Sequence, residues 1–393
     1  MNAPLSLEEA QARLLALAPV LPGERVPVEA ALGRVLAEDL RAARTQPAAD
    51  LSAMDGYALG PGAGPWHLVG ESRAGAPFAD ALADDHCVRI STGAIVPEGA
   101  TRVLLQEDAL REGDSVMAAE VPPPGRHIRA RGFDFKADDL LLARGTRMTP
   151  ARIALALTAG RAAVTVARKP RVAVLDSGDE LATDPAACAA HQIPASNGAM
   201  IAAMLAPHGC EVQRLGPIGD DMAALEGALA AGEGADILIT SGGASVGDHD
   251  LIKPALAARG AETAFWKVAI KPGKPLLVAA RGAQVVLGLP GNPVSSFVTA
   301  FLFALPLVRA SLGAADPLPR AVTMVAGEDL PAVGPRREFL RAVTDGDSVR
   351  LAGSQDSSAL SSLATADALI DRPANAPALA TGQPVRVFPL QNG

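Results

Sequence analysis

DILITSGGASVGDHD, residues 236–250, is an apolar run that breaks into small residues and ends in the carboxylates Asp248 and Asp250. The run at 237–239 has the length of a buried strand, and a helical pattern follows over 251–258. A strand leading through a Gly/Ser loop into a helix places that loop at the carboxyl end of a sheet, where open α/β sheets bind ligands. Backbone N–H groups and hydroxyls there suit an anion, and Asp250 suits a hard cation such as Mg²⁺. The candidate ligand-binding residues of the loop are Ser241, Gly242, Gly243 and Ser245. The alternative is a plain Gly-rich turn with an acidic helix cap.

The surrounding segment, residues 169–315, alternates strand and helix patterns, which predicts a parallel, doubly wound α/β sheet. Strand 172–175 leads into SGDE at 177–180, and strand 211–216 leads into GDD at 219–221. Helices are expected at 199–206 and 222–231. Together with the loop that follows strand 237–239, three strand ends carrying small and acidic residues should meet at one edge of the sheet. We therefore expect Glu180 and Asp220, together with Asp250, to bind a metal–phosphate ligand there.

Two Pro/Gly turns follow this segment. KPGKP at 271–275 presents Lys271, Lys274 and Pro275, and lysine is a good partner for a phosphate-like oxyanion. LPGNP at 289–293 opens a helix expected over 294–312, with Pro290, Asn292 and Pro293 as ligand candidates. The alternative for the first turn is a hairpin with solvated lysines.

The flanking regions are β-rich apart from three expected helices. Ser6 and Glu9 form a capping-box pattern before a helix over 6–17, and further helices are expected at 28–37 and 149–160. Short alternating runs over 66–120 predict a small β domain, preceded by the turn at Asp55 and containing the loop with Thr92. Residues 316–393 predict an all-β domain with Arg341 on a strand, followed by a serine-rich stretch at 353–367 that contains Ser357 and reads as a flexible loop or an anion contact.

Composition restricts the function classes. A chain of 393 residues with net charge −8 predicts several domains and, without a basic stripe, no nucleic-acid partner. Three scattered cysteines exclude a disulfide framework and a structural zinc. The acidic, amphipathic N-terminus is not a signal peptide, and the apolar segment 297–308 is too short to cross a bilayer. We expect a cytoplasmic protein that does not bind membranes.

Ten stretches of the chain carry a resemblance to a known family. They are, in order, SAMDGYA (52–58), TGAIVPEGA (92–100), QED (106–108), GFDF (132–135), SGDEL (177–181), TSGGASVGDHD (240–250), KPGKPL (271–276), LPGNPVSS (289–296), REFLR (337–341) and SSALSSLATAD (357–367). Together they resemble the MoeA family of molybdopterin molybdenumtransferases, the molybdenum insertases related to the gephyrin E domain. The resemblance extends over nearly the full length.

The resemblance implies an elongated homodimer of four-domain subunits. The corresponding division is residues 1–48 with 137–168 as domain I, 49–136 as the β-rich domain II, 169–315 as the molybdopterin-binding domain III, and 316–393 as the β domain IV. Domain II of one copy would complete the active cleft of the other. Partners would include the molybdopterin adenylyltransferase and downstream molybdoenzyme maturation factors.

The resemblance also implies an activity. Such proteins use Mg²⁺ and molybdate, cleave adenylylated molybdopterin with release of AMP, and insert molybdenum. Asp55 and Thr92 would face the cleft, and Glu180, Asp220 and Asp250 would organise Mg²⁺ and phosphates. Lys271, Lys274 and Pro275 would line the oxyanion region, which Arg341 and Ser357 would close. Glu180 or Asp220 as general base is a further hypothesis. Two other classes stay open: a molybdopterin adenylyltransferase that consumes ATP, and a non-catalytic scaffold.

Overall fold

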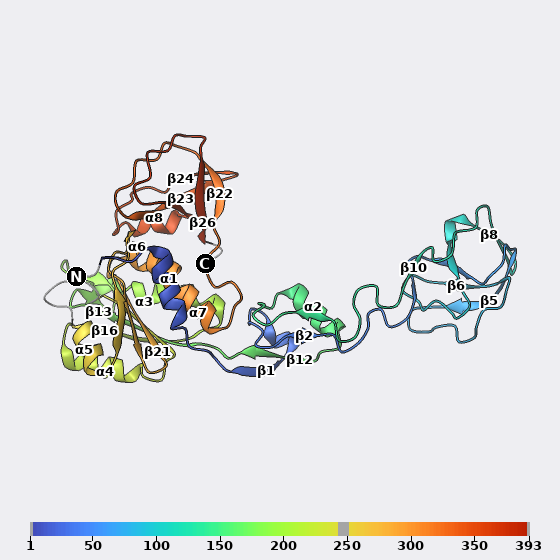
Figure 1. Ribbon diagram of the computed structural model, residues 1–393, viewed down its shortest axis with the longest axis horizontal. Coiled ribbons are helices and arrows are strands. Elements are labelled where there is room, and N and C mark those ends of the chain that lie inside the picture. Colours follow the sequence, from blue (N-terminus) through green and yellow to red (C-terminus); the bar gives the residue numbers. More distant parts are fainter. Residues whose placement is uncertain (1–2, 243–250, 391–393) are drawn as a thin grey trace.

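The computed structural model describes residues 3–242 and 251–390 and shows an elongated molecule. A body, built from a central sheet domain with a C-terminal sheet domain above it, lies at one end (Figure 1). A thin arm, residues 23–41 and 140–167, leads from the body to a distal lobe, residues 51–129, at the other end. The chain therefore passes out along the arm and back again before it forms the central sheet.

The central sheet has six strands in the order β16-β13-β17-β21-β20-β18. The first four are parallel, as expected for a doubly wound sheet, and β20 and β18 are antiparallel additions. The predicted parallel, doubly wound sheet is confirmed for these four strands, and the other two are antiparallel because the short turn at 282–283 can only join antiparallel neighbours. The strands are β13 (Arg171–Ser177), β16 (Glu211–Ile218), β17 (Ile237–Ser241), β18 (Glu262–Trp266), β20 (Leu277–Arg281) and β21 (Gln284–Leu289).

Helices cover both faces of this sheet, because alternate side chains of the buried strands point to opposite sides. Val172 and Val174 pack in one apolar core, and Ala173 and Leu175 pack in another. The first core contains α1, α3 and the long helix that runs through α6, η5 and α7; the second contains α4 and α5. The bounds are α1 (Leu7–Ala16), α3 (Asn197–Leu205), α4 (Met222–Ala231), α5 (Ile252–Ala258), α6 (Pro293–Thr299), the π-helical η5 (Ala300–Ala304) and α7 (Leu305–Ser311).

The long helix Pro293–Ser311 has the length and composition of a membrane span, but 83% of its apolar window is buried inside the molecule. Its bounds agree to within one residue with the helix expected over 294–312, because Pro306 lies in the first turn of α7 and does not end the helix. The expectation of a buried core helix is confirmed.

The arm is a narrow, two-way connection. It contains β1 (Gly23–Pro27) paired with β12 (Ala163–Ala167), β2 (Leu40–Arg41) paired with β11 (Leu140–Leu142), and α2 (Pro150–Thr158), capped by Thr149. The helix expected at 28–37 was wrong. Only the 3-10 turn η1 (Val28–Ala31) forms, because Leu32 is extended and Gly33 has a positive φ of 76°.

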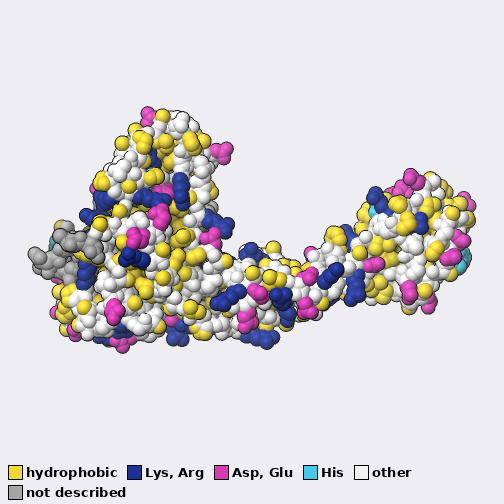
Figure 2. Space-filling model, viewed as in Figure 1, with side chains coloured by type: hydrophobic (Ala, Val, Ile, Leu, Met, Phe, Trp, Pro, Cys, Tyr) yellow, Lys and Arg dark blue, Asp and Glu magenta, His cyan; other side chains and the backbone are white. Residues whose placement is uncertain are grey.

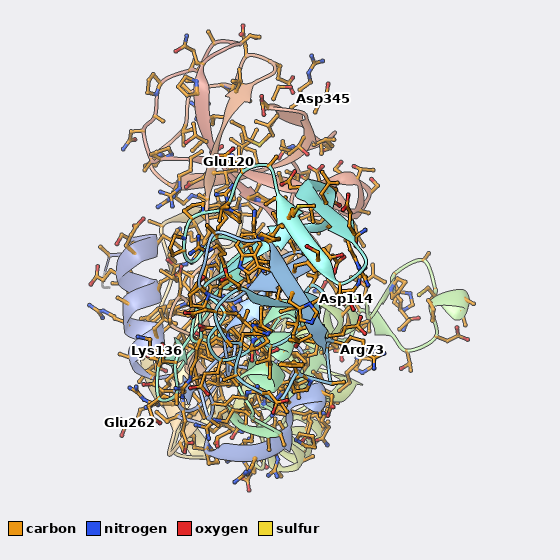
Figure 3. All side chains as sticks on the ribbon, turned by 90° about the vertical axis from the view of Figure 1, so that its right-hand side faces the viewer. Arg73, Asp114, Glu120, Lys136, Glu262 and Asp345 are labelled. Atoms are coloured by element: carbon orange, nitrogen blue, oxygen red, sulfur yellow. The ribbon has the colours of Figure 1, made fainter. Side chains whose placement is uncertain are left out.

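The distal lobe is a six-stranded sheet in the order β7-β4-β6-β5-β9-β8, and Figure 3 views it end-on, with Arg73 and Asp114 toward the reader. This confirms the expected small β domain. The elements are β3 (Leu51–Ser52), β4 (Gly56–Leu59), β5 (Trp66–Ser72), β6 (His86–Ile90), β7 (Arg102–Leu105), η2 (Gln106–Asp108), β8 (Ala109–Glu112), β9 (Ser115–Ala118) and β10 (Ile128–Arg129).

The C-terminal domain is a sheet in the order β19-β23-β24-β22-β26-β25, which curls back because β23 also pairs with β25. Its first strand, β19 (Ile270–Lys271), comes from the KPGKP segment and joins the two domains of the body. For the serine-rich stretch at 353–367, the flexible-loop interpretation is wrong in part. The structure shows that this stretch contains helix α8 (Leu360–Thr365). The other strands are β22 (Val322–Ala326), β23 (Arg337–Asp345), β24 (Ser348–Leu351), β25 (Ala368–Arg372) and β26 (Pro384–Pro389).

Short elements complete the fold: β14 (Leu181–Ala182), β15 (Ile193–Pro194), η3 (Pro185–Ala187) and η4 (Ala206–His208). The division of the chain into four segments stays a prediction. Within it, α1 packs on α7 in the body, although residues 1–48 were assigned to the same unit as the arm.

Candidate functional site

Four strand ends of the central sheet finish in register at one edge. Ser177 pairs with Ile218, Asp176 with Ser241, and Ser241 with Leu289. The loops that follow β16, β13, β17 and β21 therefore start side by side, which confirms that these strand ends meet at the carboxyl edge. We call this region the carboxyl-edge site.

Two of its loops are joined through Asp179, whose Oδ1 accepts a hydrogen bond of 2.9 Å from the N–H of Asp220. Asp220 and Asp221, adjacent in sequence, differ in what they do. The carboxylate of Asp221 accepts a hydrogen bond of 2.8 Å from the N–H of Ala224 and caps α4, whereas Asp220 is exposed at the loop. Glu180 is also exposed, and its carboxylate folds back over Gly178, where a Cβ would lie 2.4 Å from Oε2.

The glycine loop begins with a close approach of two backbones. A Cβ on Gly242 would lie 2.3 Å from the carbonyl oxygen of Ser177, and φ at Gly242 is 98°. Ser241 is buried at the end of β17, and its hydroxyl accepts a hydrogen bond of 2.9 Å from the amide of Asn197. The predicted ligand residues Gly243, Ser245 and Asp250 lie outside the described residues.

Asn197 was not predicted as a site residue. Its amide also donates to the carbonyl of Gly291 at 2.6 Å, so one side chain at the start of α3 ties the loops after β17 and β21 together. The only signal in the sequence was the SNG triplet, residues 196–198, before an apolar run.

Asp176, also not predicted, is 2% exposed and lies directly below these loops. Burial raises the pKa of its carboxyl, and the opposing influences are Arg214, 3.5 Å from Oδ2, and the N–H of Gly198. A Cβ on Gly198 would lie 2.1 Å from Oδ2, so this carboxyl is packed against the first turn of α3. It fixes the base of the site without being exposed to a ligand.

The KPGKP turn lies at the same edge, because β20 runs antiparallel to β21 and begins where β21 ends, with Leu277 opposite Gly288. Lys271 and Lys274 are exposed, and Pro275 is half-buried. The Nζ of Lys271 lies 3.0 Å from Oε1 of Glu338 in the C-terminal domain. Gly273, with φ of 101°, packs against Thr299 of α6, so the turn leans on the helix that follows LPGNP.

The C-terminal domain contacts the LPGNP loop directly. The amide of Asn292 donates to the hydroxyl of Ser357 at 3.0 Å, and the N–H of Val294 donates to the carbonyl of Ser357 at 3.2 Å. Pro290 is buried, and Pro293 is the first residue of α6. Ser357 therefore lies against the LPGNP loop, and its contact with an oxyanion stays a prediction.

Arg341 is 1% exposed and donates to the carbonyls of Ser354 at 2.6 Å and Asp356 at 3.0 Å. Its guanidinium holds the loop that carries Ser357. A direct contact between Arg341 and an oxyanion stays a prediction.

Asp55 and Thr92 lie apart from all of these residues, in the distal lobe at the far end of the arm (Figure 1). Asp55 Oδ1 accepts hydrogen bonds from the backbone N–H of Thr92 at 2.7 Å and from its hydroxyl at 3.2 Å, and both residues are exposed. Gly56 has no room for a side chain, since a Cβ would lie 1.9 Å from the carbonyl oxygen of Leu104. The turn thus presents a carboxylate and a hydroxyl together.

Comparison with known proteins assigns the chain to a family. The model of the MoeA N-terminal region (domain I and II) matches residues 5–160, that of a probable molybdopterin binding domain matches 173–310, and that of the MoeA C-terminal region (domain IV) matches 323–390. A protein of Haemophilus influenzae, named molybdopterin molybdenumtransferase, is 38% identical over 311 residues, 77% of each chain. The chain belongs to the MoeA family.

Further similarity extends over more of the length. A molybdopterin molybdenumtransferase of a Nostoc species is 34% identical over 93% of this chain and 88% of its own. The crystal structure of a molybdopterin biosynthesis MoeA protein from Pyrococcus horikoshii OT3 superposes with a TM-score of 0.86 at 26% identity, covering 98% of this chain and 100% of that one. The MoeA resemblance stated from the sequence motifs is thereby confirmed.

Proposed function

We propose that this MoeA chain is a molybdopterin molybdenumtransferase that takes adenylylated molybdopterin and molybdate, releases AMP and forms the molybdenum cofactor. Relatives of that name at 38% and 34% identity support the reaction class. The observation that carries the proposal is the carboxyl-edge site. Exposed lysines and carboxylates converge there with the hydroxyls of Ser241 and Ser357, beneath the C-terminal domain.

The substrate carries a phosphoanhydride and the second substrate is an oxyanion, so the site has to offset negative charge. Lys271 and Lys274 are exposed at the KPGKP turn and supply two ammonium groups. When an incoming oxygen bonds to the adenylyl phosphorus, the anhydride P–O bond breaks, so AMP carries the incoming oxygen and the molybdopterin phosphate leaves with the bridging oxygen. Charge develops on the leaving phosphate, and a positioned lysine stabilises it without reorganisation.

Magnesium fits the donors of this site. In residues 3–242 and 251–390, no group of three His, Cys, Asp or Glu side chains is placed to hold a metal by itself. Glu180 and Asp220, however, are exposed carboxylates that follow neighbouring strands. Mg²⁺ is usually held by one or two carboxylates together with substrate phosphates, so these two would hold it. When bound, it would neutralise phosphate charge.

The other residues of the site position the substrate. Asn197 keeps the loops after β17 and β21 together, and Asn292 ties the second of these loops to Ser357. Because the Ser357 loop comes from the C-terminal domain, that domain restricts solvent access on this side of the site.

The distal lobe enters the proposal through a second copy of the chain. Asp55 and Thr92 cannot reach the carboxyl-edge site of their own chain, from which the arm separates them (Figure 1). Met54 and Ile95, beside this pair, are 42% and 40% exposed, which suits burial against a partner. We propose a homodimer in which the distal lobe of each copy covers the carboxyl-edge site of the other.

The test is AMP release from adenylylated molybdopterin by the purified protein, with and without molybdate and Mg²⁺. Release that depends on both, with molybdenum retained in the pterin, is the expected result. Turnover of ATP with unadenylylated molybdopterin, without AMP release from the adenylylated form, would instead make the protein an adenylyltransferase.

A further inference from the structure

A recess of about 710 Å³ lies where the arm joins the body, and four separate parts of the chain line it. Arg147 and Arg152 come from the arm, at the start of α2. His208 follows α3, and Arg309 lies in α7. Residues 314–320, between α7 and the C-terminal domain, complete the wall. We call this recess the hinge pocket.

The hinge pocket is remote from the carboxyl-edge site. α3 begins at the carboxyl edge of the central sheet, beside Ser241, and ends near His208. Because the helix runs back along the sheet, its last turn lies at the opposite edge, where Arg171 begins β13 after the arm. A ligand of the hinge pocket would therefore not compete with substrate.

The charge of the lining is unusual for this chain. Among the described residues that line the pocket there are four arginines and one carboxylate, Asp316, whereas the whole chain has a net charge of −8. Asp316 is already engaged, because its Oδ2 accepts a hydrogen bond of 2.9 Å from Nε of Arg320 and lies 2.8 Å from Nη2 of the same guanidinium. Lys and Arg side chains also follow the arm on the surface in Figure 2.

Backbone carbonyls hold these guanidinium groups in place. Arg147 donates to the carbonyls of Gly33 at 3.3 Å and Pro207 at 2.9 Å, which links the arm to the body. Arg152 donates to the carbonyl of Arg147 at 2.5 Å. A carbonyl accepts a hydrogen bond but carries no full charge. These contacts therefore do not neutralise the positive charge of Arg147 or Arg152.

Arg147 and Arg309 are close enough to repel one another. Burial lowers the pKa of Arg309 first, the charge of Arg147 lowers it further, and Asp316 acts in the opposite direction. Bringing like charges together in a half-buried recess costs free energy, which a bound anion would offset. Guanidinium groups are also the side chains best suited to tetrahedral oxyanions, because they donate in pairs.

We propose that the hinge pocket binds a tetrahedral oxyanion of the phosphate class, free or as a phosphate monoester, and that the anion fastens the arm to the body. Arg147 and Arg152 reach it from the arm, and Arg309 and Arg320 reach it from the body. The orientation of the arm determines where Asp55 and Thr92 lie, so occupancy of this pocket would control the reach of the distal lobe.

The binding test is titration calorimetry with inorganic phosphate or AMP, at constant ionic strength set with NaCl. It needs no turnover, so its outcome is independent of the proposed reaction. Both ligands can also meet the carboxyl-edge site, so for each of them only the part of the binding that depends on Arg309 or Arg152 counts. The test variants are Arg309→Gln and Arg152→Gln. The matched control is Arg73→Gln, which removes the same charge on the distal lobe (Figure 3), where Arg73 is 65% exposed.

We expect phosphate to bind the wild-type protein and the Arg73→Gln variant equally, and each test variant about tenfold more weakly, the loss for one charged hydrogen bond. Tighter binding of AMP than of phosphate at the Arg309-dependent site would identify a monoester as the ligand, and the reverse would identify the free oxyanion. Phosphate binding no stronger than that of chloride, or equal in all four proteins, would overturn the proposal.

The fastening step has its own readout in amide hydrogen exchange. Phosphate should slow exchange in residues 146–152 of the arm and 314–320 of the body in the wild-type protein. Arg309→Gln should abolish this protection while the exchange of the central strands stays as in the wild type, which shows that the variant is folded. Protection that persists in a folded Arg309→Gln protein would contradict the proposal.

Discussion

Asp220 and Asp221 show how neighbouring identical side chains take different roles. Asp221 caps α4 through the N–H of Ala224, and Asp220 is exposed in a loop whose backbone is held by Asp179. We therefore expect Asp220→Asn to slow AMP release roughly tenfold or more, which corresponds to about 1.4 kcal/mol of transition-state stabilisation, with little change in Tm. Asp221→Ala should lower the free energy of unfolding by about 1 kcal/mol, the loss of a cap, and leave AMP release nearly unchanged.

Both variants are compared with the wild type by AMP release at saturating Mg²⁺ and by thermal unfolding. If Asp220→Asn left AMP release unchanged under these conditions, neither metal binding nor a general-base role could be assigned to Asp220.

The position of most residues of the carboxyl-edge site could be predicted from the sequence, because these residues directly follow strands. Glycine and serine runs after an apolar strand indicated backbone close to a ligand, and Gly242 does approach Ser177 closely. Asn197 could not be predicted in the same way. Its two acceptors, on Ser241 and Gly291, lie 44 and 94 residues further along the chain, so their proximity depends on the register of the sheet.

Arg168 and Asp236 fix where the central strands begin relative to the arm. Arg168 follows β12 of the arm, and its guanidinium donates to both carboxylate oxygens of Asp236, at 2.8 and 2.6 Å. Asp236 precedes β17 and also accepts from the N–H of Arg171 at 2.8 Å. Burial by itself raises the pKa of Asp236, but these hydrogen bonds outweigh it, so the pKa lies below its ordinary value.

We expect Asp236→Asn to lower the free energy of unfolding at pH 7 by about 1–3 kcal/mol, because a charged hydrogen-bond acceptor is lost. A carboxyl with a lowered pKa in the folded state contributes stability above its unfolded pKa of about 3.9 and loses it as the pH falls through the folded pKa. The difference in Tm between variant and wild type should therefore shrink below about pH 4.

The control is Glu9→Gln in α1, which removes the exposed Glu9–Arg13 pair, where the side chains are 2.7 Å apart. Such a pair contributes only about 0.3–0.5 kcal/mol. A Tm difference for Asp236→Asn that was no larger than the control, or that did not change with pH, would contradict the role assigned to this ion pair.

Helices with a clear hydrophobic period could be predicted from the sequence. Strand pairs formed by residues far apart in the chain could not. The ends of α1, α2 and α4 agree with the sequence prediction to within two residues, because Ser6, Thr149 and Asp221 cap them. The pairing of β1 with β12, in which Gly23 lies opposite Ala167, brings together residues 144 apart. No local pattern encodes that pairing, and it makes the arm.

At the scale of the whole molecule, the arm is the feature that links fold to function. The resemblance to a family predicted an elongated subunit, whereas composition and periodicity indicated only several domains. The structure places Asp55 and Thr92 at one end of the molecule and Lys271 at the other (Figure 1). If all three serve one reaction, they must come from different copies of the chain.

Mixing two inactive variants tests this arrangement. Asp55→Asn disables the distal lobe, and Lys271→Ala disables the carboxyl-edge site. Each homodimer should be inactive, because both of its clefts carry the substitution. A mixed dimer, however, contains one cleft built from the intact lobe of one copy and the intact edge of the other. Random co-assembly from co-expressed chains should therefore restore AMP release to about a quarter of the wild-type activity per chain, since half the dimers are mixed and each has one intact cleft. If each cleft were instead built within one chain, every cleft in the mixture would carry one of the two substitutions. A mixture of folded, dimeric proteins that stays inactive would therefore show that the two ends of the molecule do not meet across a dimer.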